Sequence, residues 1–174
     1  MSVTSKSLAP GFLLASPPLG DPNFDRTVVL LAIHGDGGAL GFVVNRAAPL
    51  SLGELLGFAG YGNGNGKTAD SSPVYVGGPV QPSSGWIVGL DLETTAESEI
   101  IPVGDRVRIT SSRDAFDALA RDVENRVVGE PDPKRRMVML GYSGWAPGQL
   151  EGEIATGAWL PVPMDEGILF DVAI

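Results

Sequence analysis

Three glycine-rich motifs carry polar residues that are able to bind a ligand, and each lies at the end of an expected strand. Arginine would hold an anion, backbone amides would supplement it, and tryptophan would supply an apolar wall. The motifs therefore suggest one small-anion or small-molecule site. Its residues would be Asn45 and Arg46 of GFVVNR, Gly77 and Gly78 of GGPV, and Trp145 and Gln149 of GYSGWAPGQLE. Glycine in these motifs equally serves close packing of the backbone, which is the interpretation that we favour.

Residues for catalysis are few. Ser143 lies in GYSGW, which resembles a nucleophile elbow, but Trp145 replaces the final glycine of that motif. His34 is the single histidine and precedes the serine by over a hundred residues, against the usual order of the elbow fold. We interpret it as a surface turn residue. Because there are no cysteines, a thiol nucleophile is excluded, and a transition metal has almost no ligands. We predict no catalytic residue, metal or cofactor, and favour a protein that is not an enzyme.

The stretch GYGNGNGKT, residues 60–68, ends like a nucleotide-binding P-loop. The P-loop pattern places a glycine five residues before its Gly-Lys-Thr ending, and Tyr61 stands there. A P-loop also follows a strand and opens a helix, so that helix amides hold the phosphate. Here a helix is expected before the stretch and a strand after it. We therefore predict a solvated Gly/Asn loop.

The charge and hydropathy of the chain limit the classes of partner that it is expected to bind. There are 12 basic and 21 acidic residues, a net charge of −9, which repels a polyphosphate at long range. The one basic run, Lys134–Arg136, is expected to be solvated at the start of a strand. We therefore predict no direct binding of nucleic acid. No apolar run reaches the roughly 18 residues that span a membrane, so we expect a cytoplasmic protein that does not bind membranes.

Hydrophobic periodicity predicts many short elements and no linker between them. Capping boxes place helix starts at Ser51 and Ser111, and a third helix is expected from Pro147 to Gly157. We therefore predict one domain over residues 1–174, of the α+β or mixed α/β class, with about three helices. Strands or extended segments are expected at 11–15, 27–33, 40–44, 73–77, 86–90, 106–110, 136–142, 159–162 and 168–172.

The same motifs, in the same order, resemble the YqgE/AlgH family of bacterial proteins. The resemblance rests on GFLLAS at 11–16, GDPNFDRTVV at 20–29, GALGFVVNR at 38–46, VGGPV at 76–80 and GYSGWAPGQLE at 141–151. It implies a compact α/β protein with a bifurcated, partly barrel-like mixed sheet and flanking helices. The family has no established catalytic residues to transfer. It usually has alanine at the position of Ser143, and some members are labelled transcriptional regulators.

Two functions remain open on these grounds. The first is a non-enzymatic protein, a transcriptional regulator that acts through an unidentified protein partner. The second is a protein or enzyme that binds a small anion or small molecule in a pocket built from Arg46, the Gly77-Gly78 turn and Trp145. The sequence does not specify the oligomeric state.

Overall fold

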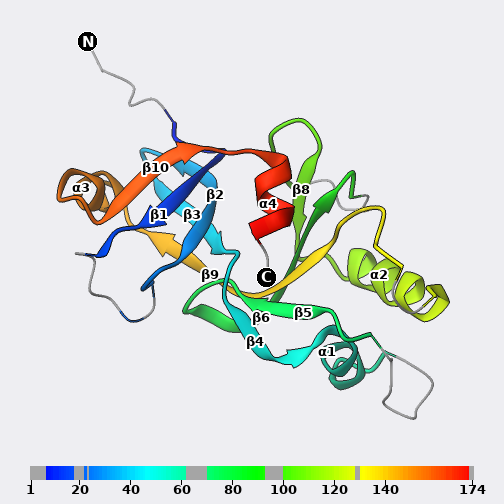
Figure 1. Ribbon diagram of the computed structural model, residues 1–174. Helices are drawn as coiled ribbons and strands as arrows, with labels where there is room; N and C mark the ends of the chain where they lie inside the picture. Colours follow the sequence, from blue (N-terminus) through cyan, green and yellow to red (C-terminus); the bar gives the residue numbers. More distant parts are fainter. Residues whose placement is uncertain are drawn as a thin grey trace. The chain divides into compact units, whose positions relative to one another are not determined.

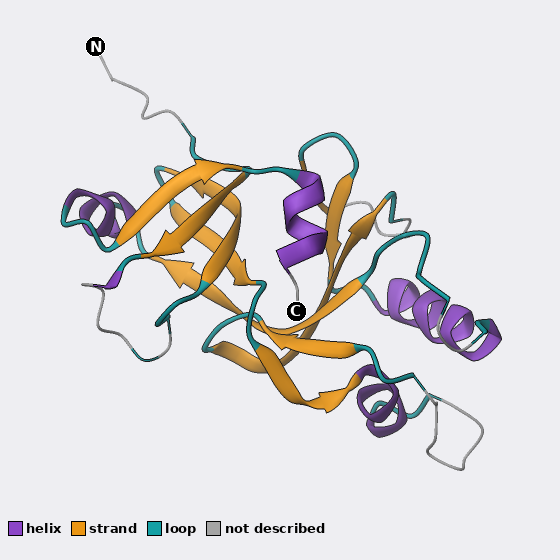
Figure 2. Cartoon of the chain, viewed as in Figure 1, coloured by secondary structure: helices purple, strands orange, loops and turns teal. Residues whose placement is uncertain are grey.

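The computed structural model describes residues 7–17, 22, 24–61, 70–92, 100–127 and 130–172. Strands and helices both occur along these residues (Figure 1 and Figure 2), which confirms the predicted α+β class. The elements are β1 (Gly11–Ala15), β2 (Val28–Gly35), β3 (Gly38–Val43), β4 (Ala47–Ser51), α1 (Leu52–Phe58), β5 (Pro73–Val76), β6 (Val80–Leu90), β7 (Ile100–Val103), β8 (Val107–Thr110), α2 (Arg113–Asn125), β9 (Met137–Trp145), α3 (Gln149–Ala155), β10 (Trp159–Pro163) and α4 (Glu166–Val172).

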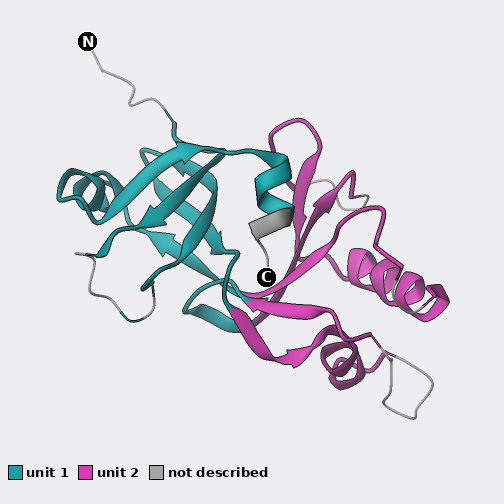
Figure 3. Ribbon diagram, in the orientation of Figure 1, with its two compact units in different colours: residues 1–46, 76–83, 141–174 teal, residues 47–75, 84–140 magenta. Residues whose placement is uncertain are grey.

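The chain forms two compact units (Figure 3). Unit 1 contains residues 1–46, 76–83 and 141–174, and unit 2 contains residues 47–75 and 84–140. Each unit is described separately below. The single domain expected over residues 1–174 stays a prediction.

Unit 1 is built on a curled antiparallel sheet with the strand order β10-β1-β2-β3-β9. The strands are rich in Val, Leu and Ile, which suit a pleated, buried surface. Leu13, Val29 and Leu31 of β1 and β2 form one buried face together with Trp145 and Trp159. Helix α3 packs against this face through Leu150 and Ile154. The tryptophans therefore lie where the sheet and α3 meet.

Unit 2 pairs β6 with β8 and β8 with β7, and pairs β4 with β5, in each case antiparallel. Its core lies between these strands and the helices α1 and α2, whose apolar stripes include Leu52, Leu56, Leu119 and Val123. Ser51 caps α1 as predicted, because its hydroxyl accepts the N–H of Glu54 at 3.2 Å.

Helix α2 begins one residue later than predicted. Ser112, rather than Ser111, is its N-cap, and the Ser112 hydroxyl accepts the N–H of Ala115. Both serines precede the apolar stripe, so the stripe alone does not distinguish them. Two strands, β4 and β7, were not predicted either.

The C-terminal prediction was wrong. Residues 168–172 were expected to be extended, but they belong to helix α4. The run Ile168–Phe170 is too short to separate a strand from a helix by its pattern. The deciding group is Asp165, whose carboxylate accepts the N–H of Ile168 at 3.0 Å and so supports the first turn. For α3, Pro147 lies before the helix, whose N-cap is Gly148.

Most of the GYGNGNGKT stretch lies outside the described residues, which resume at Asp70. Its flanks are described: α1 precedes it and β5 follows it. This order is the reverse of the strand and helix that flank a P-loop. No helix in the described part of the chain is long and apolar enough to cross a membrane.

Candidate functional site

Asn45 and Arg46 hold the segment Phe24–Val28, which leads into β2. The side-chain oxygen of Asn45 accepts the N–H of Val28 at 2.9 Å, and its amide nitrogen donates to the carbonyl of Arg26 at 3.1 Å. Arg46 Nη2 donates to the carbonyl of Asp25 at 3.2 Å. Both the oxygen and the nitrogen of the Asn45 side-chain amide therefore form hydrogen bonds with the backbone. The two residues support a turn in which Arg26 adopts a left-handed φ of 57°.

Gly77 and Gly78 lie against the backbone of β9. The Gly77 carbonyl accepts the N–H of Val43 at 2.8 Å and the hydroxyl of Ser143 at 3.1 Å. A Cβ atom on Gly78 would overlap the carbonyl group of Tyr142. A Cβ atom on Gly141, whose φ is 74°, would likewise overlap the Gly78 carbonyl oxygen. Glycine is therefore required here for two backbone segments to approach closely.

Trp145 and Gln149 meet at one carboxylate, that of Glu153 on α3. The indole N–H groups of Trp145 and Trp159 donate to Glu153 Oε1 at 3.2 and 3.0 Å. The amide of Gln149 donates to Glu153 Oε2 at 3.0 Å, and its oxygen accepts the N–H of Ala146 at 3.0 Å. One carboxylate therefore satisfies three donors, two of them on buried indoles.

The aromatic rings connect this carboxylate to the Phe24–Val28 segment. The Phe24 ring lies 6.3 Å from Trp145 and 5.4 Å from Trp159, measured between ring centroids, and the two indoles lie 6.0 Å apart. Phe24 also precedes the residues that Asn45 and Arg46 hold. The first and third motifs therefore meet through Phe24–Val28 within unit 1. The second motif meets the first at its backbone, because the Arg46 carbonyl accepts the N–H of Val76 at 2.8 Å.

Ser143 and His34 do not contact each other. Ser143 is fully buried and its hydroxyl donates to Gly77. The surface location expected for His34 was wrong, since its side chain is only 3% exposed. Its Nδ1 accepts the N–H of Leu8 at 2.9 Å, and its Nε2 bonds the Glu151 carboxylate. That bond holds the pKa of Glu151 below its ordinary value.

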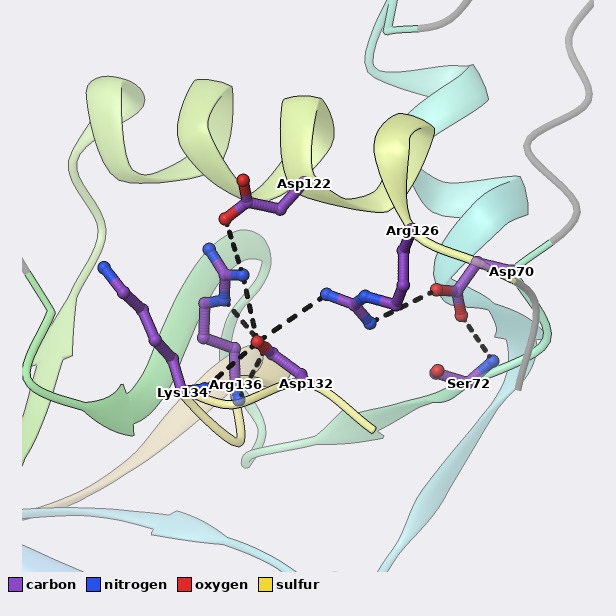
Figure 4. Close-up of polar contacts among 7 residues, drawn as sticks. All are labelled: Asp70, Ser72, Asp122, Arg126, Asp132, Lys134 and Arg136. Atoms are coloured by element: carbon purple, nitrogen blue, oxygen red, sulfur yellow. Dashed lines mark hydrogen bonds and ion pairs between the residues drawn. The ribbon is translucent and has the colours of Figure 1, made fainter. Parts of the chain in front are cut away.

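Unit 2 carries a separate network of ion pairs (Figure 4). Arg136, with a side chain only 3% exposed, donates from Nε to Asp132 at 2.8 Å and from Nη2 to Asp122 at 2.8 Å. Arg126 lies 3.7 Å from Asp132 and 3.8 Å from Asp70, distances measured between nitrogen and oxygen. The network joins α2 to the residues before β5 and before β9. Of the basic run 134–136, Arg136 is therefore buried and paired rather than solvated.

Within this network, burial acts to raise the pKa of Asp132. Hydrogen bonds from Arg136 and its positive charge outweigh burial and hold the pKa below the ordinary 3.8. Burial acts to lower the pKa of Arg136, but the bonds to Asp132 and Asp122 outweigh burial and raise that pKa above its ordinary value. Both charges are therefore stabilised by their pairing, as a structural ion pair requires.

Two residues at the centre of these contacts, Glu153 and Phe24, are not among the predicted site residues. Glu153 follows Gln149 by four residues on a helix, so their side chains share one helix face. That spacing is a weak signal. Phe24 carried no signal of its own, because its role depends on the two indoles that the fold brings to it.

Known proteins match the chain over nearly its whole length. The AlgH-like family, DUF179, matches residues 12–174. A UPF0301 protein of Anaeromyxobacter dehalogenans is 42% identical over 170 residues, which cover 95% of this chain and 81% of the relative. One from Myxococcus xanthus is 43% identical over 155 residues, 89% of this chain and 78% of the relative.

Solved structures support the same family. The solution structure of AlgH from Pseudomonas aeruginosa has a TM-score of 0.75 at 32% identity, and the match covers 99% of this chain and 86% of that one. A Corynebacterium diphtheriae protein of 19% identity shares the fold, with a TM-score of 0.62 over 94% of this chain and 80% of its own. The chain thus belongs to the AlgH-like family, as its motifs indicated.

Proposed function

We propose that this is a non-enzymatic cytoplasmic protein that acts through a protein partner, with the control of transcription as its output. The observation that carries the proposal is a row of apolar side chains across unit 1. Leu160 of β10 pairs with Leu14 of β1, which pairs with Val28 of β2. Paired residues lie on the same face of a sheet, so the three side chains are neighbours.

This apolar row reaches the surface. Leu160 is 57% exposed, and Leu14 and Val28 are half-buried. The next row on the same face, Phe12 and Leu30, is buried. A row that ends in an exposed leucine and continues into the core gives a partner a rigid apolar contact.

The charges around the row indicate what that partner carries. Arg26 and Arg46 are the only arginines or lysines among the described residues of unit 1. Arg26 is exposed and comes two residues before Val28, and Arg46 donates to the carbonyl of its neighbour Asp25. In a chain of net charge −9, both cations of this region thus lie at one end of the apolar row. They favour a partner segment with an aliphatic side chain next to a carboxylate.

We expect the partner to dock on the side chains of the apolar row rather than to add a strand to the edge of the sheet. β10 is an edge strand of the sheet, but it contains Pro161 and Pro163, which have no N–H to donate to a further strand. The partner therefore contacts the side chains of the row rather than the edge of the backbone.

The test is quantitative co-purification of the tagged protein from its host, followed by reconstitution with the purified partner. Leu160→Asp and Arg26→Glu should each weaken partner binding about tenfold or more, since they remove an apolar anchor and a complementary charge. Phe58→Asp is the matched control, because Phe58 is 82% exposed but lies on α1 of unit 2. A partner that binds all four proteins equally, or no partner at all, would refute the proposal.

A small-anion site at Arg46, the Gly77-Gly78 turn and Trp145 is the second candidate, with Asn45 and Gln149 as further ligands. Its support is that the motifs of Arg46 and Trp145 meet around Phe24–Val28, and that the Gly77 carbonyl accepts the N–H of Val43 in the first motif. Phosphate, carboxylates and nucleotides should then raise the melting temperature of the wild type and not of Arg46→Gln. If both proteins respond equally, Arg46 does not hold the anion.

A further inference from the structure

The turn at residues 24–27, which leads into β2, is exposed at its tip and held at its base. Asp25 and Arg26 are exposed, whereas Phe24 is half-buried and Thr27 is only 3% exposed. The N–H and the hydroxyl of Thr27 both donate to the Phe24 carbonyl, at 3.1 and 2.8 Å. The 24–27 turn therefore closes on itself and presents two side chains of opposite charge at the surface.

Side chains from the segment after β3 hold the next two carbonyls of the turn. Arg46 Nη2 donates to the Asp25 carbonyl at 3.2 Å, and the side-chain amide of Asn45 donates to the Arg26 carbonyl at 3.1 Å. With the Thr27 hydroxyl, three side chains bond three consecutive carbonyls. Water can satisfy the carbonyls of an ordinary surface turn. These bonds therefore serve the shape of the turn rather than its solvation.

Arg26 has a backbone conformation that glycine adopts more easily. Its φ is 57°, in the left-handed region, where the Cβ atom of an L-residue crowds the backbone. A turn that needed only this shape would be served by glycine. Residues in such conformations persist where their surroundings fix them, and they gather at functional sites. An arginine that is held in this way indicates a use for its side chain.

The Arg26 guanidinium lies next to the apolar row of unit 1. It forms no ion pair with any residue that the structure describes. Val28, two residues later, belongs to the row with Leu14 and Leu160. Asn45, which holds the Arg26 carbonyl, also accepts the N–H of Val28 at 2.9 Å. One amide therefore fixes the cation and the row relative to each other.

We propose that the 24–27 turn is a preformed recognition turn, in which Asn45 positions Arg26 for a carboxylate of the protein partner. The inference rests on the proposed function, because the apolar row supplies the other half of the same surface. A guanidinium can pair with a carboxylate through two parallel hydrogen bonds, so a fixed arginine also fixes the direction of approach. Because the turn is ordered beforehand, the partner does not have to order it.

Nitrogen-15 relaxation of the full chain tests the preformed turn without a partner. The amides of Asp25, Arg26 and Thr27 should have order parameters of about 0.85, the value of a rigid backbone, and Asn45→Ala should lower them below about 0.6. The Leu13 amide in β1 should not change. If Asn45→Ala does not fold, Asn45→Asp takes its place, because it keeps an acceptor for β2 and loses the donor. Low order in the wild type, or unchanged order in the variant, would overturn the proposal.

Two dipeptides test the carboxylate, acetyl-Leu-Glu-amide and its uncharged match acetyl-Leu-Gln-amide. At millimolar concentrations both should shift the methyl signals of Leu160, but the acidic peptide should bind up to about fivefold tighter, as an exposed ion pair allows. Only the acidic peptide should shift the Nε–H signal of Arg26. Equal binding of the two peptides, or no shift at Arg26, would refute the assignment of the carboxylate.

Matched variants separate the charge from its position. Arg26→Asn removes the charge and tolerates the left-handed backbone, so the turn should stay ordered and the two peptides should bind equally. Asn45→Ala keeps the charge and loses the order, so the preference for the acidic peptide should shrink. Asp25→Asn is the control at the neighbouring exposed position and should keep the preference. A full preference in Asn45→Ala would exclude Asn45 as the positioning residue.

Failure of this inference and failure of the proposed function give different results. A turn that is ordered and prefers the acidic peptide, with a purified partner that binds Leu160→Asp as tightly as the wild type, would refute the partner site and leave the recognition turn. A disordered or unselective turn, with partner binding that is weakened by Leu160→Asp, would refute the recognition turn and leave the partner site.

Discussion

At the scale of single residues, the Glu153 carboxylate is the acceptor that holds the predicted site residues Trp145 and Gln149 together. It accepts from two buried indoles and from Gln149. Glu153→Ala should leave both indole N–H groups without an acceptor and lower the free energy of unfolding by about 2–4 kcal/mol. Urea denaturation measures this loss, with Glu124→Ala on the exposed side of α2 as control. Equal stability of the two variants would mean that the indoles find other acceptors.

Gly78 offers a second test of the same kind. An added Cβ would overlap the backbone carbonyl group of Tyr142 in β9, which cannot move aside as the end of a flexible side chain can, and it would also overlap the Ser143 hydroxyl. Gly78→Ala should therefore cost about 3 kcal/mol of unfolding free energy, at the upper end for overpacking. Gly37 lies in the turn between β2 and β3, and an added Cβ there meets no atom within 4 Å. Gly37→Ala should leave the melting temperature nearly unchanged, and a similar loss in both variants would contradict the packing role.

The sequence predicts one site from Gly77, Gly78, Asn45 and Trp145, because each lies at a strand end in a glycine-rich motif, and that shared site stays a prediction. The contacts themselves could not be predicted. Asn45 bonds a segment seventeen or more residues away, and the partner of Trp145 depends on how α3 packs. Such contacts depend on tertiary structure, which local pattern does not encode.

At the scale of elements, Asp132 and Arg136 pair with each other before β9, and Arg136 also bonds Asp122 of α2. Asp132→Asn removes a charge from a buried arginine and should lower the free energy of unfolding by about 3 kcal/mol. Asp91 and Arg106 form a matched pair on the surface, with side chains 61% and 55% exposed. Asp91→Asn should change stability little, because exposed pairs are screened by solvent. Thermal and urea unfolding compare the two variants.

Acid should weaken the same pair. The pKa of Asp132 is lowered in the folded protein, so its contribution to stability is present above the ordinary value of 3.8 and is lost as pH falls through the folded pKa. The acid-dependent part of wild-type stability should therefore be smaller in Asp132→Asn. An unchanged pH dependence in that variant would assign acid unfolding to other carboxylates.

Element prediction succeeded where the apolar pattern was long and failed where it was short. The stripe of α2 and the central strands were visible in the sequence, and the cap of α1 at Ser51 was correct. Helix α4 was mistaken for an extended segment because its apolar run spans three residues. β4 contains a proline and β7 is four residues long, so neither shows a clear alternation.

At the scale of the whole molecule, the charge of −9 bears on transcription. If the protein acts through a partner, it should not bind random duplex DNA by itself, because phosphate contacts need a basic surface. Fluorescence anisotropy at low salt measures this. Micromolar binding that weakens steeply as salt rises would show direct contact with DNA and would contradict the partner model.

The most direct test of the partner model is photocrosslinking in living cells with a benzophenone amino acid at position 160 or at position 58. Both side chains are exposed, so both variants should fold, but only Leu160 belongs to the apolar row of unit 1. The account predicts a discrete crosslinked protein from position 160, absent from position 58 and lost when Arg26→Glu is added. Crosslinks from position 58 alone, or none from position 160, would contradict it.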